Sequence, residues 1–330
     1  MANVTILGSG SWGLALALTL YDNKHNITVW SKFKDEVNEL KTNRKSRFLP
    51  KIYIPEEIEI TTKTDSLKTA DIVVLAVPSF AIRDTAKLLK NKKEGIIVNV
   101  AKGLEEKSLK TLSQVIKEET SLPVCVLSGP SHAEEVSKKV PTSIVAANEN
   151  FEICKTVIDA FSTPYLRIYS NNDVLGVELG GALKNVIAVA GGFCDGLELG
   201  DNSKAALITR GLNEIASLGC ALGATEKTFA GLSGLGDLIV TCNSRHSRNH
   251  RFGELVAKGS KPCDALKTVG TVEGYHAAKQ VIALAKKQGV EMPIATLCYK
   301  VMYEDLNVQE AMKILMTRPS KDESDFLWVK

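Results

Sequence analysis

The chain has 330 residues, of which 44% are hydrophobic and 24% are charged, and its formal net charge is +3. This length is too great for one ordinary hydrophobic core and fits two domains, while the composition excludes a disordered chain. The small net charge gives no reason to expect a nucleic-acid partner.

The first half of the chain alternates short apolar runs with amphipathic stretches. The runs predict strands at residues 4–7, 27–30, 72–77, 96–100, 124–127 and 143–146, and the stretches between them predict helices at 11–21, 35–40, 79–89 and 109–119. Several of the strands are continuously apolar, as expected where helices cover both faces of a parallel sheet. The alternation therefore predicts βαβ units in a doubly wound, mainly parallel sheet.

The pattern changes after about residue 170. Strand signals become scarce, and helices are predicted at residues 174–189, 203–218, 248–257, 273–286, 294–301 and 309–315. The turn residues Asn171, Asn172 and Asp173 open the first of these helices. We therefore predict a dinucleotide-binding α/β domain at 1–170 and an all-α substrate-binding and catalytic domain at 171–330. No role is assigned to the aromatic end, residues 325–330.

Cysteine usage and the apolar segments bear on the cellular compartment. The seven cysteines are scattered without a CxxC pair, which argues against a disulfide framework or a structural zinc site and fits a reducing cytoplasm. The apolar N-terminus lacks the basic region of a signal peptide and is interrupted by glycines. Residues 174–192 contain Glu178, Lys184 and five glycines, which favours a buried helix over a membrane span. We expect a cytoplasmic protein.

A glycine-rich turn, Gly8-Ser9-Gly10-Ser11-Trp12-Gly13, follows the first predicted strand and opens the first predicted helix. In this context Gly8 makes the tight turn, Gly10 lets the backbone approach a pyrophosphate, and Gly13 lets the helix pack closely on the strand. The amides and dipole of the helix N-terminus then face the phosphates. The turn predicts a dinucleotide site, and the alternative is a strand–helix turn that binds no ligand.

The end of the second strand bears on the choice of dinucleotide. NAD-binding folds carry an acid about 20 residues after the glycines, which binds the ribose hydroxyls. Here the segment reads Ser31-Lys32-Phe33-Lys34, and no acid precedes Asp35. The serine and the lysines could hold a 2′-phosphate, which favours NADP(H) and leaves NAD(H) possible.

The segment Glu178–Val186 carries paired glycines and a lysine inside a predicted helix. Glycines in a helix interior cost about 1 kcal/mol each relative to alanine, which suggests that a ligand or another backbone approaches closely. Lys184 lies one turn later in an apolar stretch, and a desolvated lysine can exchange a proton near neutral pH. A proton-transferring lysine and one that extends to solvent both remain open.

Two further segments carry polar groups suited to a substrate. Residues 231–238 form a glycine-rich stretch, interpreted as a loop that presents Asp237. Ser247, Arg248 and Asn249 precede or begin a predicted helix, where they could bind a phosphate or could cap an ordinary basic helix start. His246 and His250 are four residues apart but belong to no convincing ligand cluster, so no metal is expected.

Together these segments resemble bacterial NAD(P)-dependent glycerol-3-phosphate dehydrogenase, from Gly8 to about Glu323. The resemblance depends on the number, order and spacing of short motifs rather than on any single one. The motifs are the Gly8–Gly13 turn, Phe48-Leu49-Pro50, Ala101-Lys102-Gly103-Leu104, Leu127-Ser128-Gly129-Pro130-Ser131-His132-Ala133, Leu183-Lys184-Asn185, residues 205–211, Gly234-Leu235-Gly236-Asp237-Leu238, Ser247-Arg248-Asn249 and Glu273-Gly274.

The resemblance implies roles for individual residues. Cofactor contacts are implied for Ser11, Trp12, Lys32, Lys102, Ala133, Arg248 and Glu273, and substrate contacts for Lys102, Gly129, Ser131, Lys184, Asp237, Ser247, Arg248 and Asn249. At Lys32 the family usually carries arginine for the 2′-phosphate. The segment 270–273 is one residue shorter than the usual pattern, so only Glu273 is carried over from it.

The implied activity is the interconversion of dihydroxyacetone phosphate and sn-glycerol 3-phosphate, which supplies phospholipid synthesis. Hydride would pass between nicotinamide C4 and substrate C2, with Lys184 as proton donor or acceptor. Lys102 and Asp237 would position and polarise the oxygen, and Arg248 would bind the phosphate. A related two-domain β-hydroxyacid-type dehydrogenase and a non-catalytic dinucleotide sensor are the alternatives. We expect no membrane embedding, and a homodimer is possible.

Overall fold

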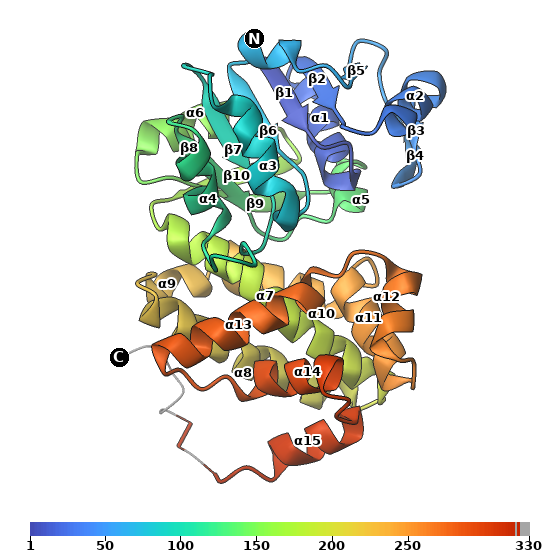
Figure 1. Cartoon of the computed structure of the whole chain (residues 1–330), viewed down its shortest axis with the longest axis vertical. Helices are drawn as coiled ribbons and strands as arrows, with labels where there is room; N and C mark the ends of the chain where they lie inside the picture. The colour runs from blue at the N-terminus through green and yellow to red at the C-terminus, as the bar shows by residue number, and fades with distance from the viewer. Residues whose placement is uncertain (321, 324–330) are drawn as a thin grey trace. The chain divides into compact units, whose positions relative to one another are not determined.

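The computed structural model describes residues 1–320, 322 and 323 (Figure 1). The aromatic end at 325–330 lies outside these residues. Contacts divide the chain into an N-terminal unit, residues 1–105 and 110–174, and a helical unit, residues 106–109 and 175–330. Each unit is described by itself below.

One eight-stranded sheet forms the centre of the N-terminal unit, with strand order β10-β9-β8-β7-β6-β1-β2-β5. Neighbouring strands are parallel except β8 and β9, which pair antiparallel. The bounds are β1 Asn3–Leu7, β2 Asn26–Trp30, β5 Glu59–Thr61, β6 Ile72–Leu75, β7 Ile96–Asn99, β8 Val124–Ser128, β9 Thr142–Ala147 and β10 Leu166–Asn171. The chain leaves β1 toward β2 on one side and returns as β6 on the other, which makes a topological switch point at the carboxyl end of β1.

Both faces of this sheet are buried, because successive residues of a strand point to opposite sides. Val4 and Ile6 of β1 belong to one core, which α1 (Ser11–Asp22) and α6 (Phe151–Phe161) complete. Leu7 belongs to a second core, formed with α3 (Ile82–Ala86) and α4 (Leu112–Glu119). Helices thus cover both faces (Figure 1), which confirms the predicted doubly wound, mainly parallel sheet.

Several elements of the N-terminal unit differ from their predictions. The helix expected at 79–89 is α3 flanked by short 3₁₀ turns, and the helix expected at 109–119 begins only at Leu112 because Leu109 has a φ of 58°. The strands β5 and β10, the helix α6, and a two-stranded hairpin of β3 (Lys45–Ser46) and β4 (Leu49–Tyr53) were not predicted. A short helix, α5 (Ala133–Val136), follows β8.

The described part of the helical unit is all helical, as predicted. Its central element is α7 (Val174–Gly196), which is long and apolar enough to span a membrane but has 89% of its apolar window buried inside the protein. α7 is therefore a core helix. Around it lie α8 Gly200–Ala221, α9 Glu226–Phe229, α10 Asp237–Asn243, α11 Arg248–Ala257, α12 Pro262–Val269, α13 Glu273–Gln288, α14 Pro293–Tyr303 and α15 Val308–Met316.

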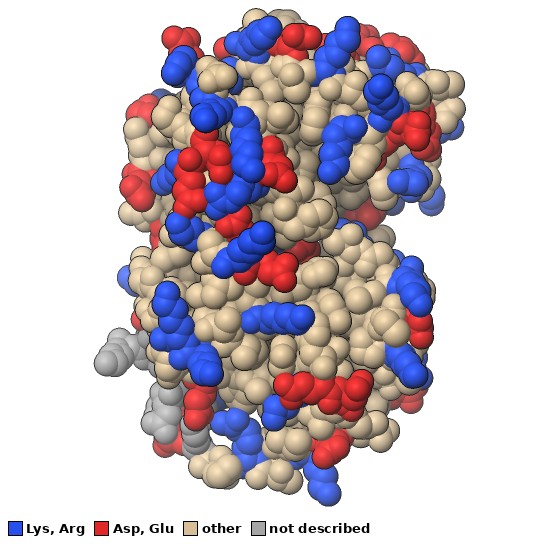
Figure 2. Space-filling view, viewed as in Figure 1, with Lys and Arg blue, Asp and Glu red and all other residues tan. Residues whose placement is uncertain are grey.

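A buried carboxylate joins two of these helices. Glu214 of α8 accepts hydrogen bonds from the backbone N–H groups of Ile294 (2.7 Å) and Ala295 (3.1 Å) in the first turn of α14. The carboxylate thus satisfies donors that have no partner within their own helix. On the face drawn in Figure 2, basic side chains are interspersed with acidic ones.

Candidate active site

The glycine turn after β1 has the geometry of a phosphate-binding turn. Gly8 has a φ of 125°, and a Cβ there would lie 2.4 Å from the carbonyl oxygen of Ala76. A Cβ on Gly13 would lie 2.2 Å from the carbonyl oxygen of Gly8, so these two glycines serve the fold. A Cβ on Gly10 would meet nothing within 4 Å. Gly10 is also the N-cap of α1 and provides no side-chain cap, so open space lies before the first amides of the helix.

This arrangement fits the pyrophosphate of a dinucleotide. The backbone at Gly10 can be approached closely, and α1 directs its N-terminal amides toward that space. The predicted cofactor residues Ser11 and Trp12 form the first turn of α1, and both are half-buried. Part of the Trp12 ring packs on the core beneath α1.

An acidic side chain lies at the end of β2, where none was predicted from the order of residues. Glu36, in the first turn of α2 (Lys34–Asn43), reaches back so that Oε2 accepts hydrogen bonds from Ser9 Oγ at 2.7 Å and Ser31 Oγ at 2.5 Å. No acid precedes Asp35 along the chain, but the fold brings the Glu36 carboxylate back to the end of β2. Lys32, predicted to hold a 2′-phosphate, is exposed, and its Nζ lies 5.0 Å from the centroid of the Phe33 ring.

The residues predicted on two later strand ends come together. Lys102 follows β7 and donates from Nζ to the carbonyl oxygen of Gly129 at 2.9 Å, just beyond β8. Ser131 Oγ donates to the same oxygen at 2.9 Å. Gly129 has a φ of 133°, and a Cβ there would lie 3.1 Å from Ile144 Cα, so this position requires glycine. Ala133 is buried at the start of α5.

In the helical unit Lys184 is buried in an ion pair. Its Nζ lies 2.6 Å from Asp237 Oδ1 and donates to Thr241 Oγ1 at 2.6 Å, while Thr241 Oγ1 donates to the backbone carbonyl of Asp237 at 2.5 Å. The side chains of Lys184 and Asp237 are only 5% and 2% exposed. The alternative that Lys184 extends to solvent is therefore wrong. Burial alone disfavours the charged ammonium, and a carboxylate at this distance favours it.

Asp237 is presented by a helix rather than by the expected loop. Residues Leu232–Gly236 form a π-helical turn that continues directly into α10. Gly180 of α7 makes this possible, because a Cβ there would lie 2.7 Å from the carbonyl oxygen of Ser233. The sequence left open whether a ligand or another backbone approaches the glycines of this helix, and at Gly180 it is another backbone. The helix also places Thr241 one turn after Asp237, a neighbour that the loop interpretation could not reveal.

Asn249 connects three helices of the same unit. Its Nδ2 donates to Asn185 Oδ1 at 2.9 Å, and its Oδ1 accepts from the backbone N–H of Gly274 at 2.8 Å. Asn185 follows Lys184 in α7, and Gly274 follows the predicted cofactor contact Glu273, the first residue of α13. The Asn249 bridge therefore fixes the start of α13 close to the lysine-bearing turn.

The start of α11 combines a structural cap with an exposed cation. Ser247 Oγ is the N-cap of α11 and accepts from the backbone N–H of His250 at 3.2 Å, while Arg248 is exposed. His250 Nε2 lies 2.7 Å from Asp195 Oδ2, so this histidine belongs to the polar cluster that Asp195 forms with Lys204. Within residues 1–320, 322 and 323 no group of three or more histidine, cysteine or acidic side chains could hold a metal ion.

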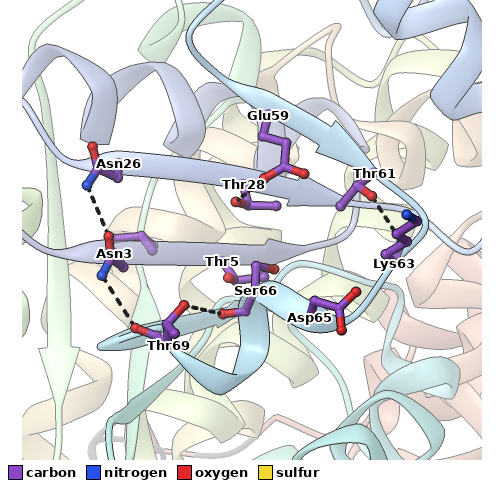
Figure 3. A pocket seen from close by; sticks show the side chains of 11 residues that line it. Asn3, Thr5, Asn26, Thr28, Glu59, Thr61, Lys63, Asp65, Ser66 and Thr69 are labelled. Carbon is purple, nitrogen blue, oxygen red and sulfur yellow. Dashed lines mark hydrogen bonds between the residues drawn. The ribbon is translucent and has the colours of Figure 1, made fainter.

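A separate polar hollow of about 370 Å³ lies on one face of the sheet edge in the N-terminal unit (Figure 3). Its walls come from β1, β2, β5 and the segment after β5, and Asn3 and Asn26 at the starts of two strands line it. None of the predicted site residues lines this hollow. Ligands of doubly wound sheets bind outside the carboxyl ends of the strands. The glycine turn, rather than this hollow, therefore carries the candidate site of the N-terminal unit.

Two family models match the chain, the N-terminus of NAD-dependent glycerol-3-phosphate dehydrogenase over residues 3–154 and its C-terminus over residues 173–313. The chain belongs to the NAD-dependent glycerol-3-phosphate dehydrogenase family. A relative in Fusobacterium nucleatum subsp. nucleatum, named glycerol-3-phosphate dehydrogenase NAD(P)+, is 51% identical over 98% of this chain and 99% of its own length. A Thermoanaerobacter relative of the same name is 48% identical over 97% and 98%.

Solved structures of the glycerol-3-phosphate dehydrogenase family agree with the fold. The enzyme from Coxiella burnetii matches with a TM-score of 0.92 and 37% identity, over 96% of this chain and 99% of that one. A D-mandelate dehydrogenase matches with a TM-score of 0.59 at 15% identity, over 96% and 99%. The second likeness shows the fold alone. The family resemblance inferred from the motifs is therefore confirmed, whereas the hydroxyacid-type alternative gains no support beyond a shared fold.

Proposed function

We propose that this chain interconverts dihydroxyacetone phosphate and sn-glycerol 3-phosphate with a nicotinamide dinucleotide, and that it supplies glycerol phosphate for phospholipid synthesis in the cytoplasm. The N-terminal unit would bind the dinucleotide and the helical unit would bind and protonate the substrate. Family membership supports the reaction. The observation that carries the chemistry is the buried Lys184–Asp237–Thr241 cluster.

The proposed chemistry at the substrate oxygen is assigned to Lys184. A bound nicotinamide supplies the hydride for ketone reduction or accepts it in the reverse direction. In reduction, the Lys184 ammonium gives a proton to the oxygen on C2 as that oxygen gains negative charge. In oxidation, the neutral amine takes the hydroxyl proton back. Asp237 and Thr241 orient Nζ and stabilise its charged form, so that the ion pair is complete whenever the lysine carries its proton.

The remaining predicted residues would bind and orient. Arg248 is exposed at the start of α11, where a guanidinium and helix amides suit the substrate phosphate. Lys102 would contact both cofactor and substrate, beside the Gly129 and Ser131 positions. Both polar atoms of the Asn249 amide are already hydrogen-bonded, to Asn185 and to Gly274, which favours a positioning role for Asn249 over a substrate contact.

The test uses the intact protein with dihydroxyacetone phosphate and either NADH or NADPH, and follows oxidation of the nicotinamide. We expect turnover in the wild type, a loss of at least about a hundredfold in Lys184→Met, and unchanged dinucleotide affinity in that variant. Lys258→Met is the matched control, since it removes an ion-paired lysine from the exposed position directly after α11. A wild type that binds dinucleotide without turning over would instead support the sensor alternative.

A further inference from the structure

Glu36 is an acidic residue that is hydrogen-bonded directly to the glycine turn. Its carboxylate is held by Ser9, inside the turn, and by Ser31, the first residue after β2. Both serines are buried, with 3% and 4% of their surface exposed, so their hydroxyls are fixed on the carboxylate. The backbone N–H of Gly8 also donates to the carbonyl oxygen of Trp30 at 2.9 Å, which joins the turn to the end of β2.

This position is the one that a doubly wound sheet uses to distinguish dinucleotides. The adenosine ribose lies beside the end of the second strand, and its 2′-hydroxyl donates to an acid there when the cofactor is NAD(H). In this chain the acid comes from the first turn of α2 rather than from the strand end, so the order of residues conceals it. We propose that Glu36 determines cofactor specificity by accepting a hydrogen bond from the ribose 2′-hydroxyl, and that it favours NAD(H) over NADP(H).

This inference rests on the proposed function, because it takes the dinucleotide to bind at the glycine turn. A 2′-phosphate carries about two negative charges and would meet the Glu36 carboxylate at close range. Like charges about 4 Å apart repel by an amount that corresponds to between about fivefold and several hundredfold in affinity, depending on the local dielectric. A 2′-hydroxyl meets no such penalty and offers a donor that the carboxylate can accept.

Lys32 acts in the opposite direction but is less well placed. Its ammonium is exposed, lies near the Phe33 ring and sits on a flexible stem, so binding a phosphate would require ordering that stem. Glu36 is already held in place by two buried hydroxyls. The preorganised group should therefore dominate the preference.

The experiment measures direct binding of NADH and NADPH to the intact wild type, Glu36→Gln and Asp35→Asn by nicotinamide fluorescence. We expect wild type to bind NADH at least about tenfold more tightly than NADPH. Glu36→Gln keeps the volume and an acceptor for the serines, and it should reduce this ratio at least about tenfold, mainly through tighter NADPH binding. Asp35→Asn removes the same charge from the adjacent, exposed position and should change the ratio by less than about twofold.

A second measurement needs no variant. Adenosine 5′-diphosphate should displace NADH from wild type more effectively than adenosine 2′,5′-bisphosphate, and added salt should narrow the difference because it screens the repulsion. Tighter NADPH binding by wild type, an unchanged ratio in Glu36→Gln, or an equal change in Asp35→Asn would overturn the role of Glu36. Failure of wild type to bind either dinucleotide would instead overturn the proposed function, so the two failures are distinguishable.

Discussion

Replacing Asp237 with asparagine removes the carboxylate that accompanies the buried Lys184 ammonium while keeping the volume of the side chain. In the wild type the two groups are 2.6 Å apart and almost wholly excluded from water. The variant leaves the lysine in the same enclosure without this carboxylate, although Thr241 Oγ1 still accepts its hydrogen bond. We therefore expect Asp237→Asn to destabilise the helical unit strongly, although it deletes no apolar contact.

Two estimates bound the size of this effect. Breaking a buried ion pair by removal of one partner costs about 3–5 kcal/mol, because an uncompensated charge remains. The lysine can also escape by losing its proton, which for an unperturbed lysine at pH 7 costs about 5 kcal/mol. The second figure is a ceiling, and it falls by about 1.4 kcal/mol for each unit that the pH rises. We expect a loss of about 4 kcal/mol at pH 7 and a smaller loss at pH 9.

The assay is thermal and urea unfolding of wild type, Asp237→Asn, Lys184→Met and the double variant at pH 7 and pH 9. For a unit of this size, about 4 kcal/mol corresponds to a decrease of about 8–16 °C in Tm. The double variant should be more stable than Asp237→Asn alone, since it has no buried ammonium left without a carboxylate partner. A loss below about 1 kcal/mol that does not change with pH would refute the burial argument, because it would mean that water reaches Lys184.

Three further predictions concern single side chains. Gly8→Ala should unfold or strongly destabilise the N-terminal unit, since its Cβ would collide with a carbonyl oxygen. Gly10→Ala should keep Tm within about 2 °C but weaken dinucleotide binding at least about tenfold, and scanning and titration calorimetry measure these two quantities. Burial raises the pKa of Glu214 to about 7, so the folded state binds this proton more tightly than the unfolded chain does. About 3 kcal/mol of stability should therefore be lost as the pH rises from about 4.5 to about 7. Glu214→Gln should flatten that part of a plot of Tm against pH. Asn249→Ala should cost about 1–3 kcal/mol in urea unfolding, because it leaves the Gly274 N–H and Asn185 Oδ1 without this partner. It should also lower kcat more than it raises KM, and an unchanged kcat would contradict a positioning role.

The sheet could be predicted because its signal is local. Continuous apolar runs such as Ile72–Leu75 belong only where both faces are covered, and here alternate residues do enter two different cores. The strand β5 and the helix α6 escaped prediction for different reasons. β5 has three residues, too few to show a period. α6 does carry buried residues at helical spacing, namely Cys154, Val157 and Phe161, so its pattern was present in the sequence and was overlooked.

The site was predictable in its residue types but not in its contacts. Lys184 and Asp237 are 53 positions apart in the chain, and no periodicity relates α7 to α10. Thr241 was missed because the segment before it was interpreted as a loop, and only a helix places residues four apart on one face. Glu36 was missed for a related reason, since a rule counted along the strand cannot detect a carboxylate that returns from the next helix.

The glycines of α7 lower its helix propensity but let neighbouring backbones pack closely against it near the ion pair. A Cβ on Gly192 would lie 2.0 Å from the carbonyl oxygen of His250, and one on Gly180 would lie 2.7 Å from that of Ser233. Each glycine weakens the isolated helix by about 1 kcal/mol, yet each also admits a neighbouring backbone that a methyl group would exclude. Gly180 lies one turn before Lys184 in α7, and the backbone packed against it, Leu232–Gly236, continues directly into the helix that carries Asp237. Close backbone packing thus keeps water away from the ion pair. In such an enclosure the Asp237 carboxylate and the Thr241 hydroxyl can fix the orientation of the Lys184 side chain.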